Sequence, residues 1–88
     1  MDVNVQSVEF LTLIASFTTS GMVSLGKIPN PMTNQLEKNL DQAKYSIDIL
    51  MMLKEKTKGN LTPDEDRALS NAVADLQINY LNELKADQ

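Results

Sequence analysis

The chain has 88 residues, is 42% hydrophobic, contains no cysteine or histidine, and carries a formal net charge of -4 at pH 7. This length supports one domain with a single modest core. The absent cysteines exclude disulfides and thiolate metal sites, and the absent histidines remove the usual general base near neutral pH. The acidic balance argues against a nucleic-acid partner, because binding a phosphate backbone requires a basic surface.

Apolar residues recur with helical spacing in three stretches, which predicts an all-α fold. We expect a helical bundle that dimerisation completes. The predicted helices cover about 7–25, 34–58 and 63–84 of a single domain at 1–88, with frayed ends at 1–6 and 85–88.

The first predicted helix opens with Ser7 as a candidate N-cap and then has no charged residue from Phe10 to Gly26. Its apolar arc covers about half of the helix circumference, which is wider than packing on one neighbour requires. Phe10, Ile14 and Phe17 are therefore candidate interface residues. A membrane span is the alternative, but Ser and Thr residues dilute the stretch and no basic or aromatic belt flanks it.

The first connector is predicted from three conformationally restricted residues. Gly26 suits the left-handed position that ends a helix, and Pro29 and Pro31 favour an extended chain after it. The segment from Gly21 to Ile28 matches the first seven positions of a phosphate-binding loop. It lacks the final hydroxyl residue and the preceding strand, so we do not interpret it as a nucleotide site.

The second predicted helix begins at a capping box formed by Asn34 and Glu37. Asp48 is the single charge in its apolar second half, and we interpret this carboxylate as structural or rim-exposed rather than catalytic. The main apolar stripe consists of Leu36, Leu40, Ala43, Ile47 and Leu50. A second apolar face, which predicts contact with another copy, consists of Tyr45, Ile49, Met52 and Leu53.

The second turn carries the strongest local signal in the chain. Gly59 suits a left-handed conformation, Thr62 is an N-cap with Pro63 at the first helical position, and Glu65 completes a capping box. Acidic residues after Pro63 suit the positive end of the helix dipole, so they are not interpreted as a metal site. The third helix then carries a second stripe, in which Ile78 and Leu81 are further interface candidates.

These punctuated turns and the apolar residues between them form a fairly specific combination over roughly 10–81. It consists of Leu25-Gly26, Pro29-Asn30-Pro31, Ala43, Ile47-Asp48, Leu50, Leu53 and the run from Lys56 to Thr62. The combination resembles an uncharacterised bacterial family, number eighteen-forty-four among the domains of unknown function. The resemblance implies a small cytoplasmic bacterial protein and carries over no catalytic residue. Gln77 and Asn79 stand where we associate basic residues with the family, which speaks against a shared anion-binding role.

The favoured hypothesis is a non-enzymatic interaction module that acts as a homo-oligomer, most simply a homodimer. The alternatives are an adaptor that docks on a larger protein, and a small-ligand or membrane-surface protein that uses the apolar first helix. No catalytic constellation, metal site or cofactor site is predicted, because no nucleophile and base stand at a suggestive spacing. A cytoplasmic location is expected, since the N-terminal residues lack a basic stretch before the apolar run.

Overall fold

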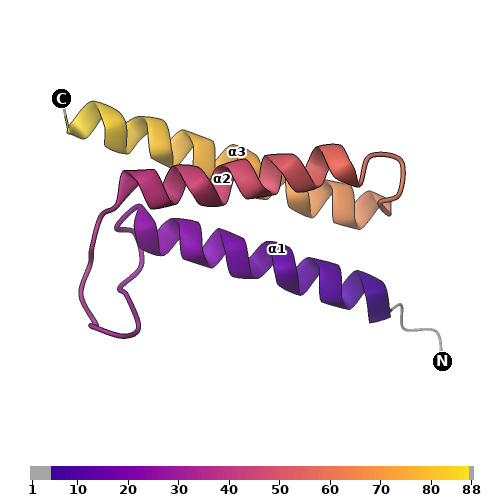
Figure 1. The fold of residues 1–88 in the computed structure, drawn as a ribbon, viewed down its shortest axis with the longest axis horizontal. Coiled ribbons are helices and arrows are strands. Elements are labelled where there is room, and N and C mark those ends of the chain that lie inside the picture. Colours follow the sequence, from indigo (N-terminus) through magenta and orange to yellow (C-terminus); the bar gives the residue numbers. More distant parts are fainter. Residues whose placement is uncertain (1–4, 88) are drawn as a thin grey trace.

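Three helices, each antiparallel to the one before it, make up most of the chain in the computed structural model. The structure describes residues 5–87 and the side chains of residues 8–87. They are α1 (Val5–Ser24), α2 (Leu40–Lys56) and α3 (Pro63–Ala86), and the described residues include no strand (Figure 1). The all-α prediction with three helices is confirmed. Val5 precedes the predicted start of the first helix, so Ser7 lies inside it. Of the ends predicted to be frayed, residues 5–6 and 85–86 are instead helical, whereas residues 1–4 and 88 lie outside the described part.

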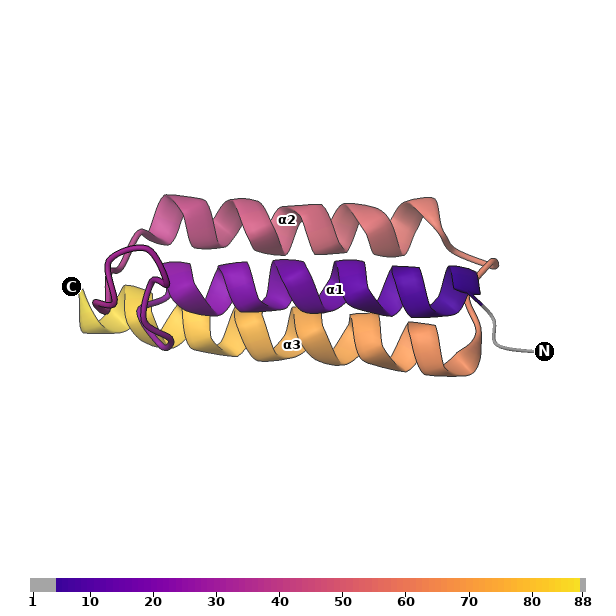
Figure 2. The same cartoon turned by 90° about the horizontal axis from the view of Figure 1, so that it is seen from below.

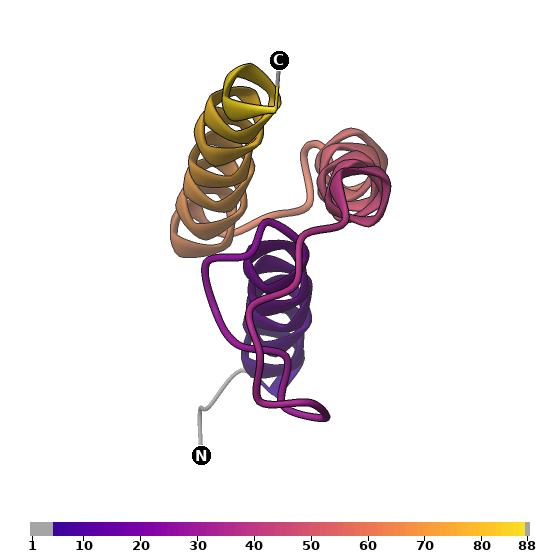
Figure 3. The same cartoon turned by 90° about the vertical axis from the view of Figure 1, so that its left-hand side faces the viewer.

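The core lies where the three helices face one another, because every pair of helices is in contact. Viewed along the helices, they stand at the corners of a triangle (Figure 3), and α1 lies between α2 and α3 when viewed from its own side (Figure 2). The buried apolar residues are Ile14, Leu25, Ala43, Ile47, Leu50, Leu69, Ala72 and Leu76.

The closest approach of α1 to α3 depends on Gly21, which is buried in the last part of α1. A Cβ atom at this position would lie 2.9 Å from Cδ2 of Leu76, a fully buried side chain. Because a contact this short requires a shift of the neighbouring atoms, the absent side chain of Gly21 sets the spacing between the two helices.

The second helix begins six residues later than the sequence predicts. Asn39 is the N-cap of α2, with an extended backbone and a side-chain oxygen that accepts a hydrogen bond from the Gln42 N–H at 3.1 Å. The predicted capping box at Asn34 and Glu37 is therefore wrong.

Glu37 instead stabilises the connector. Its carboxylate accepts hydrogen bonds from Asn30 Nδ2 at 3.0 Å and from Thr33 Oγ1 at 2.8 Å. Asn34 has a left-handed backbone with φ of 56°, which a helical residue cannot adopt. Leu36 precedes the helix and is 64% exposed, so the apolar stripe starts at Leu40 rather than at Leu36.

Ion pairs tie this connector to the C-terminal part of α3. Lys27 Nζ lies 2.7 Å from Glu83 Oε2, and Lys38 Nζ lies 2.9 Å from Glu83 Oε1 and 2.7 Å from Asp87 Oδ1. Hydrogen bonds from Lys27 and Lys38 lower the pKa of Glu83 from its ordinary value of 4.5 to about 2. Hydrogen bonds to Asp87 and Glu83 raise the pKa of Lys38 above its ordinary value.

Both predicted turns have the expected local chemistry. Gly26 has φ of 78° and donates to the Val23 carbonyl, while the Lys27 N–H donates to the Met22 carbonyl, which completes a Schellman motif after α1. Gly59 also has a positive φ, of 86°.

The predicted start of the third helix is confirmed in detail. The Glu65 N–H donates to Thr62 Oγ1 at 3.2 Å, the Thr62 N–H donates to Glu65 Oε1 at 2.8 Å, and Pro63 is the first helical residue. These bonds satisfy two N–H groups at the start of α3 that have no partner within the helix.

Candidate interaction surface

The predicted interface residues divide into two groups. Ile14 belongs to the core of the single chain, and Phe10, Phe17 and Leu53 are partly buried against that core. Ile49 is of intermediate exposure. The remaining predicted residues are exposed, and these are Tyr45, Met52, Ile78 and Leu81. Among the predicted interface residues, the exposed ones therefore all lie on α2 and α3.

Two adjoining hollows run between α2 and α3 on the side of the bundle away from α1. The first has a volume of about 350 Å³ and the second of about 470 Å³, and both are lined by Met51 and Gln77. Together they form one groove. Its apolar surroundings, which we call the α2–α3 face, consist of Met51, Met52, Tyr80 and Leu81 from the lining, with Gln77 at the centre and the exposed Ile78 next to Gln77 in the chain.

The α2–α3 face leaves large apolar side chains in solvent. Ile78 is 58% exposed, Leu81 is 55% exposed, and Met51 and Met52 are 43% exposed each. Isolated exposed apolar side chains are ordinary on a protein surface, whereas a contiguous group of them marks a site of contact. Unbranched methionine side chains also adapt readily to the shape of a partner.

Gln77 divides the groove at its middle. Its Nε2 atom donates to Met51 Sδ at 3.5 Å, which joins α3 to α2 between the two hollows. A thioether sulfur is a weak acceptor, so this contact leaves the amide able to bond a better partner. Tyr80 lies beside it and lines the first hollow with its ring.

Charged residues border the groove without dominating it. Lys44 and Asp48 line the first hollow and form an ion pair one helical turn apart, with Lys44 Nζ 2.9 Å from Asp48 Oδ2. This hydrogen bond, with the attraction of the same carboxylate, raises the pKa of Lys44. Lys54 and Glu55 border the second hollow. Asp48 thus has the position at a rim that its sequence context predicts.

Ile49 lies on a different flank of α2 from the residues that line the groove. Ile49 is two residues from Ile47 and from Met51, so it projects about 200° around the helix from the residues that line the groove. This flank is the one nearer α1, because α2 contacts only α1 and α3 among the described helices. Ile49 is therefore not part of the α2–α3 face, whereas Tyr45 lines neither hollow but lies two helical turns before Met52 on the same side of α2.

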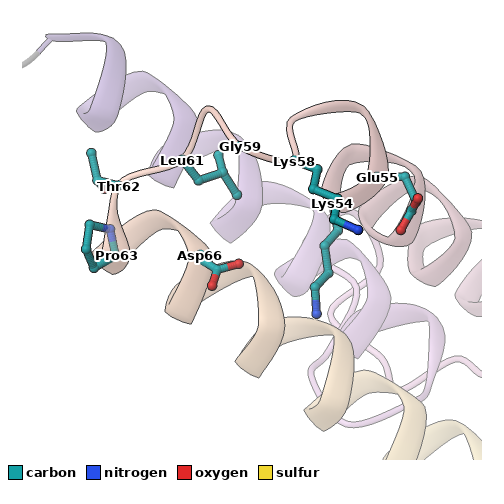
Figure 4. Close-up of a pocket in the computed structure, with 8 residues that line it drawn as sticks. All are labelled: Lys54, Glu55, Lys58, Gly59, Leu61, Thr62, Pro63 and Asp66. Atoms are coloured by element: carbon teal, nitrogen blue, oxygen red, sulfur yellow. The ribbon is translucent and has the colours of Figure 1, made fainter.

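A further pocket lies at the turn between α2 and α3 and has a volume of about 580 Å³. It is lined by two lysines, Lys54 and Lys58, and by the carboxylates of Glu55 and Asp66. The Glu55 carboxylate lies at one side of the pocket and the Asp66 carboxylate nearer its middle, so the two do not point toward each other (Figure 4). This arrangement offers no group of ligands or reacting side chains at one point.

The two segments weighed as candidate sites in the sequence, the acidic residues after Pro63 and the stretch from Gly21 to Ile28, lie in α3 and partly in α1. Within residues 5–87, no three acidic, histidine or cysteine side chains are grouped so that they could hold a metal ion. Gly21 packs against Leu76 inside the bundle, and α1 continues to Ser24. The segment that resembles a phosphate-binding loop is thus helical over its first half and has no free loop backbone there.

The exposed side of α1 is uncharged beyond Glu9, and two of its hydroxyl groups bond to their own helix. Thr12 Oγ1 donates to the Val8 carbonyl at 2.8 Å, and Ser16 Oγ donates to the Thr12 carbonyl at 3.0 Å. The helix is nevertheless too weakly apolar for a transmembrane segment, and no other helix in the described range meets that requirement.

The sequence analysis did not identify Gln77 at the centre of the groove or Tyr80 in its lining. Tyr80 falls on the main apolar stripe of the third helix, and Gln77 is a polar residue between two apolar stripes, so neither pattern marks a groove. The sequence feature that could have identified them is the spacing of Val73, Gln77 and Tyr80, which places all three on one flank of α3.

A protein-family model matches residues 7–82, which is most of the chain, and its description is domain of unknown function DUF1844. The chain belongs to this family. This match confirms the resemblance to the family that the turns and the apolar residues between them indicate. No curated protein and no solved structure matches the chain.

Proposed function

We propose that this DUF1844 protein is a non-enzymatic interaction module that forms a homodimer through the α2–α3 face. The observation that carries the proposal is the group of exposed apolar side chains around the groove, chiefly Met51, Met52, Ile78 and Leu81. Burying such side chains contributes about 25 cal/mol for each Å² of apolar surface removed from water. The mechanism is therefore association without chemistry.

The size and charge of the face suit a second copy of the chain. A standard interface takes about 800 Å² from each partner, and the bundle has principal extents of 48 × 25 × 15 Å, so one long side supplies enough surface. Two copies that each carry a net charge of -4 repel each other on average. The α2–α3 face reduces this repulsion because Lys44 and Lys54 accompany Asp48 and Glu55 around the groove.

The proposal is tested by sedimentation equilibrium and light scattering at low micromolar concentration. We expect a dimer for the natural chain and a dissociation constant raised about a hundredfold or more by Met52→Asp or Ile78→Asp, because each places a carboxylate in the contact. Leu36→Asp is the matched control, since Leu36 is exposed on the connector. A well-folded natural chain that stays monomeric would remove the proposal.

A second candidate function is an adaptor that docks α1 on a larger protein. It is favoured by the uncharged surface of α1, where Thr12 and Ser16 already satisfy their hydroxyl donors within the helix. Covering such a surface costs little desolvation of polar groups. This function requires a purified one-to-one complex that Leu13→Lys disrupts and Ile78→Asp leaves intact. For either function we place the protein in the bacterial cytoplasm, with which a chain free of cysteine is consistent.

A further inference from the structure

We propose that the second copy binds in one defined register, in which α2 packs antiparallel on the partner's α2 and α3 antiparallel on the partner's α3. The two-fold axis then crosses both helices at a right angle. This inference rests on the proposed dimer and adds the pairing of residues across it. Two independent features of the α2–α3 face, one of charge and one of size, give the same position for the axis.

The first feature is a pair of opposite charges on α2. Lys44 and Glu55 are eleven residues apart, which is about three helical turns, so they lie on one side of the helix. Lys44 borders the first hollow and Glu55 the second. The Glu55 carboxylate has no ion-pair partner among residues 5–87. A two-fold axis halfway between them places Lys44 of each copy opposite Glu55 of the other.

Lys44 can make this second contact without losing its first. Its ammonium group has three donors, and the structure uses one of them for Asp48 at 2.9 Å. The partner's carboxylate therefore adds to the existing ion pair. Because the axis repeats the contact, one dimer contains two such pairs.

The second feature is a small and a large residue on α3. Ala74 and Leu81 are both exposed and lie seven residues apart, which is about two helical turns. An axis halfway between them falls between Gln77 and Ile78. Leu81 of each copy then lies over Ala74 of the other, where the short side chain leaves room, and Ile78 covers the partner's Gln77.

The midpoint on α2 and the midpoint on α3 lie at nearly the same level along the long axis of the bundle. The hydrogen bond between Gln77 and Met51 places these residues level with each other on antiparallel helices. The midpoint on α2, between Ile49 and Leu50, is therefore about level with the peptide bond that follows Ile78. This level differs from the α3 midpoint by about one residue, or roughly 1.5 Å. One axis can thus satisfy the charge pairing and the size pairing together.

The charge pairing is tested by a charge swap measured with sedimentation equilibrium at low ionic strength. We expect Lys44→Glu and Glu55→Lys each to raise the dissociation constant about tenfold, because each replaces two attractions with two repulsions. The double variant, Lys44→Glu with Glu55→Lys, restores both attractions and returns to within about threefold of the natural chain. Circular dichroism checks that each variant keeps its helical content.

The register is tested separately by oxidative cross-linking, since the natural chain has no cysteine. Ile78→Cys lies beside the axis, so two copies form a disulfide rapidly. Asn71→Cys is the matched control, because Asn71 is exposed two turns earlier on the same side of α3. In this register its two copies are roughly 20 Å apart along the helix, too far for a disulfide.

The outcomes distinguish the register from the dimer. Rapid cross-linking at position 78 alone, with recovery in the charge-swapped double variant, supports the register. If the chain is a dimer but position 71 cross-links as fast as position 78, or the double variant remains weakened, the register is wrong and the proposed function stands. If the natural chain stays a monomer, both are overturned.

Discussion

Gln77 Nε2 donates a hydrogen bond to Met51 Sδ at 3.5 Å, and this contact links α3 to α2 at the middle of the groove. The bond is weak because a thioether sulfur is a poor acceptor. Little stability is therefore lost when the amide is removed. The amide is also the polar group at the centre of an otherwise apolar contact.

We predict that Gln77→Leu strengthens dimerisation, because a leucine adds apolar surface that the second copy removes from water. A gain of about 1.4 kcal/mol corresponds to a tenfold lower dissociation constant, which sedimentation equilibrium measures. Asn82→Leu is the control, because Asn82 is exposed on a different flank of α3. Equal effects of the two variants would contradict the role given to the α2–α3 face.

The packing of Gly21 on Leu76 gives a prediction in which two effects oppose each other. Gly21→Ala gains about 1 kcal/mol of helix propensity. The new Cβ atom lies 2.9 Å from Cδ2 of Leu76, and overpacking a tight core costs about 1 to 3 kcal/mol. Because Leu76 is fully buried and cannot move aside freely, we expect a net loss of roughly 1 kcal/mol in urea unfolding.

Two further variants separate the opposing effects at Gly21. Ser20→Ala changes the neighbouring exposed residue of α1 and is expected to be neutral or slightly stabilising. Combining Gly21→Ala with Leu76→Val relieves the contact, so the double variant loses less stability than the two single losses added together. Strictly additive losses would show that the contact does not limit packing.

The sequence predicts best where the determining residues are neighbours in the chain. Thr62, Pro63 and Glu65 satisfy one another within a single turn, so the start of α3 could be read directly. The start of α2 could not be predicted in this way. Asn34 and Glu37 have the spacing of a capping box, but Glu37 is engaged by connector side chains.

The competing contacts of the connector are remote in sequence. Lys27 and Lys38 bond Glu83, which is 56 and 45 residues away, respectively. No local sequence pattern predicts such partners. These ion pairs hold the connector extended where the sequence alone favours a helix. Local propensity was thus overridden by tertiary contacts.

The candidate surface was predicted only in part for a related reason. The second stripes on α2 and α3 could be recognised, and Met52, Ile78 and Leu81 are indeed exposed. Whether a stripe faces solvent or α1 depends on how the helices are placed, which periodicity does not determine. Ile14 therefore resembled an interface residue in the sequence while it is part of the core.

The corrected start of α2 predicts different costs for two leucine truncations. Leu50 is fully buried, so Leu50→Ala is expected to lower the free energy of unfolding by about 2 to 5 kcal/mol. Leu36→Ala is expected to change it by less than about 0.5 kcal/mol, because Leu36 is exposed outside the helix. Urea unfolding measures both. A large loss of unfolding free energy in Leu36→Ala would show that Leu36 belongs to the apolar stripe after all.

The ion pairs of Glu83 predict a dependence of stability on pH. Its pKa of about 2 in the folded chain lies below the ordinary value of 4.5, so the unfolded chain binds the proton more readily. The stabilisation by Glu83 is therefore fully present above pH 4.5, declines as the unfolded chain takes up a proton below that pH, and is lost once the pH has fallen through about 2. Salt reduces it at any pH, because the pairs are partly exposed.

We test this dependence by comparing the natural chain with Glu83→Gln in urea unfolding between pH 7 and pH 2. The variant is expected to be less stable at pH 7, and the difference is expected to shrink between pH 4.5 and pH 2 as Glu83 of the unfolded natural chain takes up a proton. Asp75→Asn is the control, because Asp75 is exposed on the same helix and its side chain has no ion-pair partner among the described residues. A difference for Glu83→Gln that stays constant over this range would mean that the carboxylate does not tie the connector to α3 through its charge.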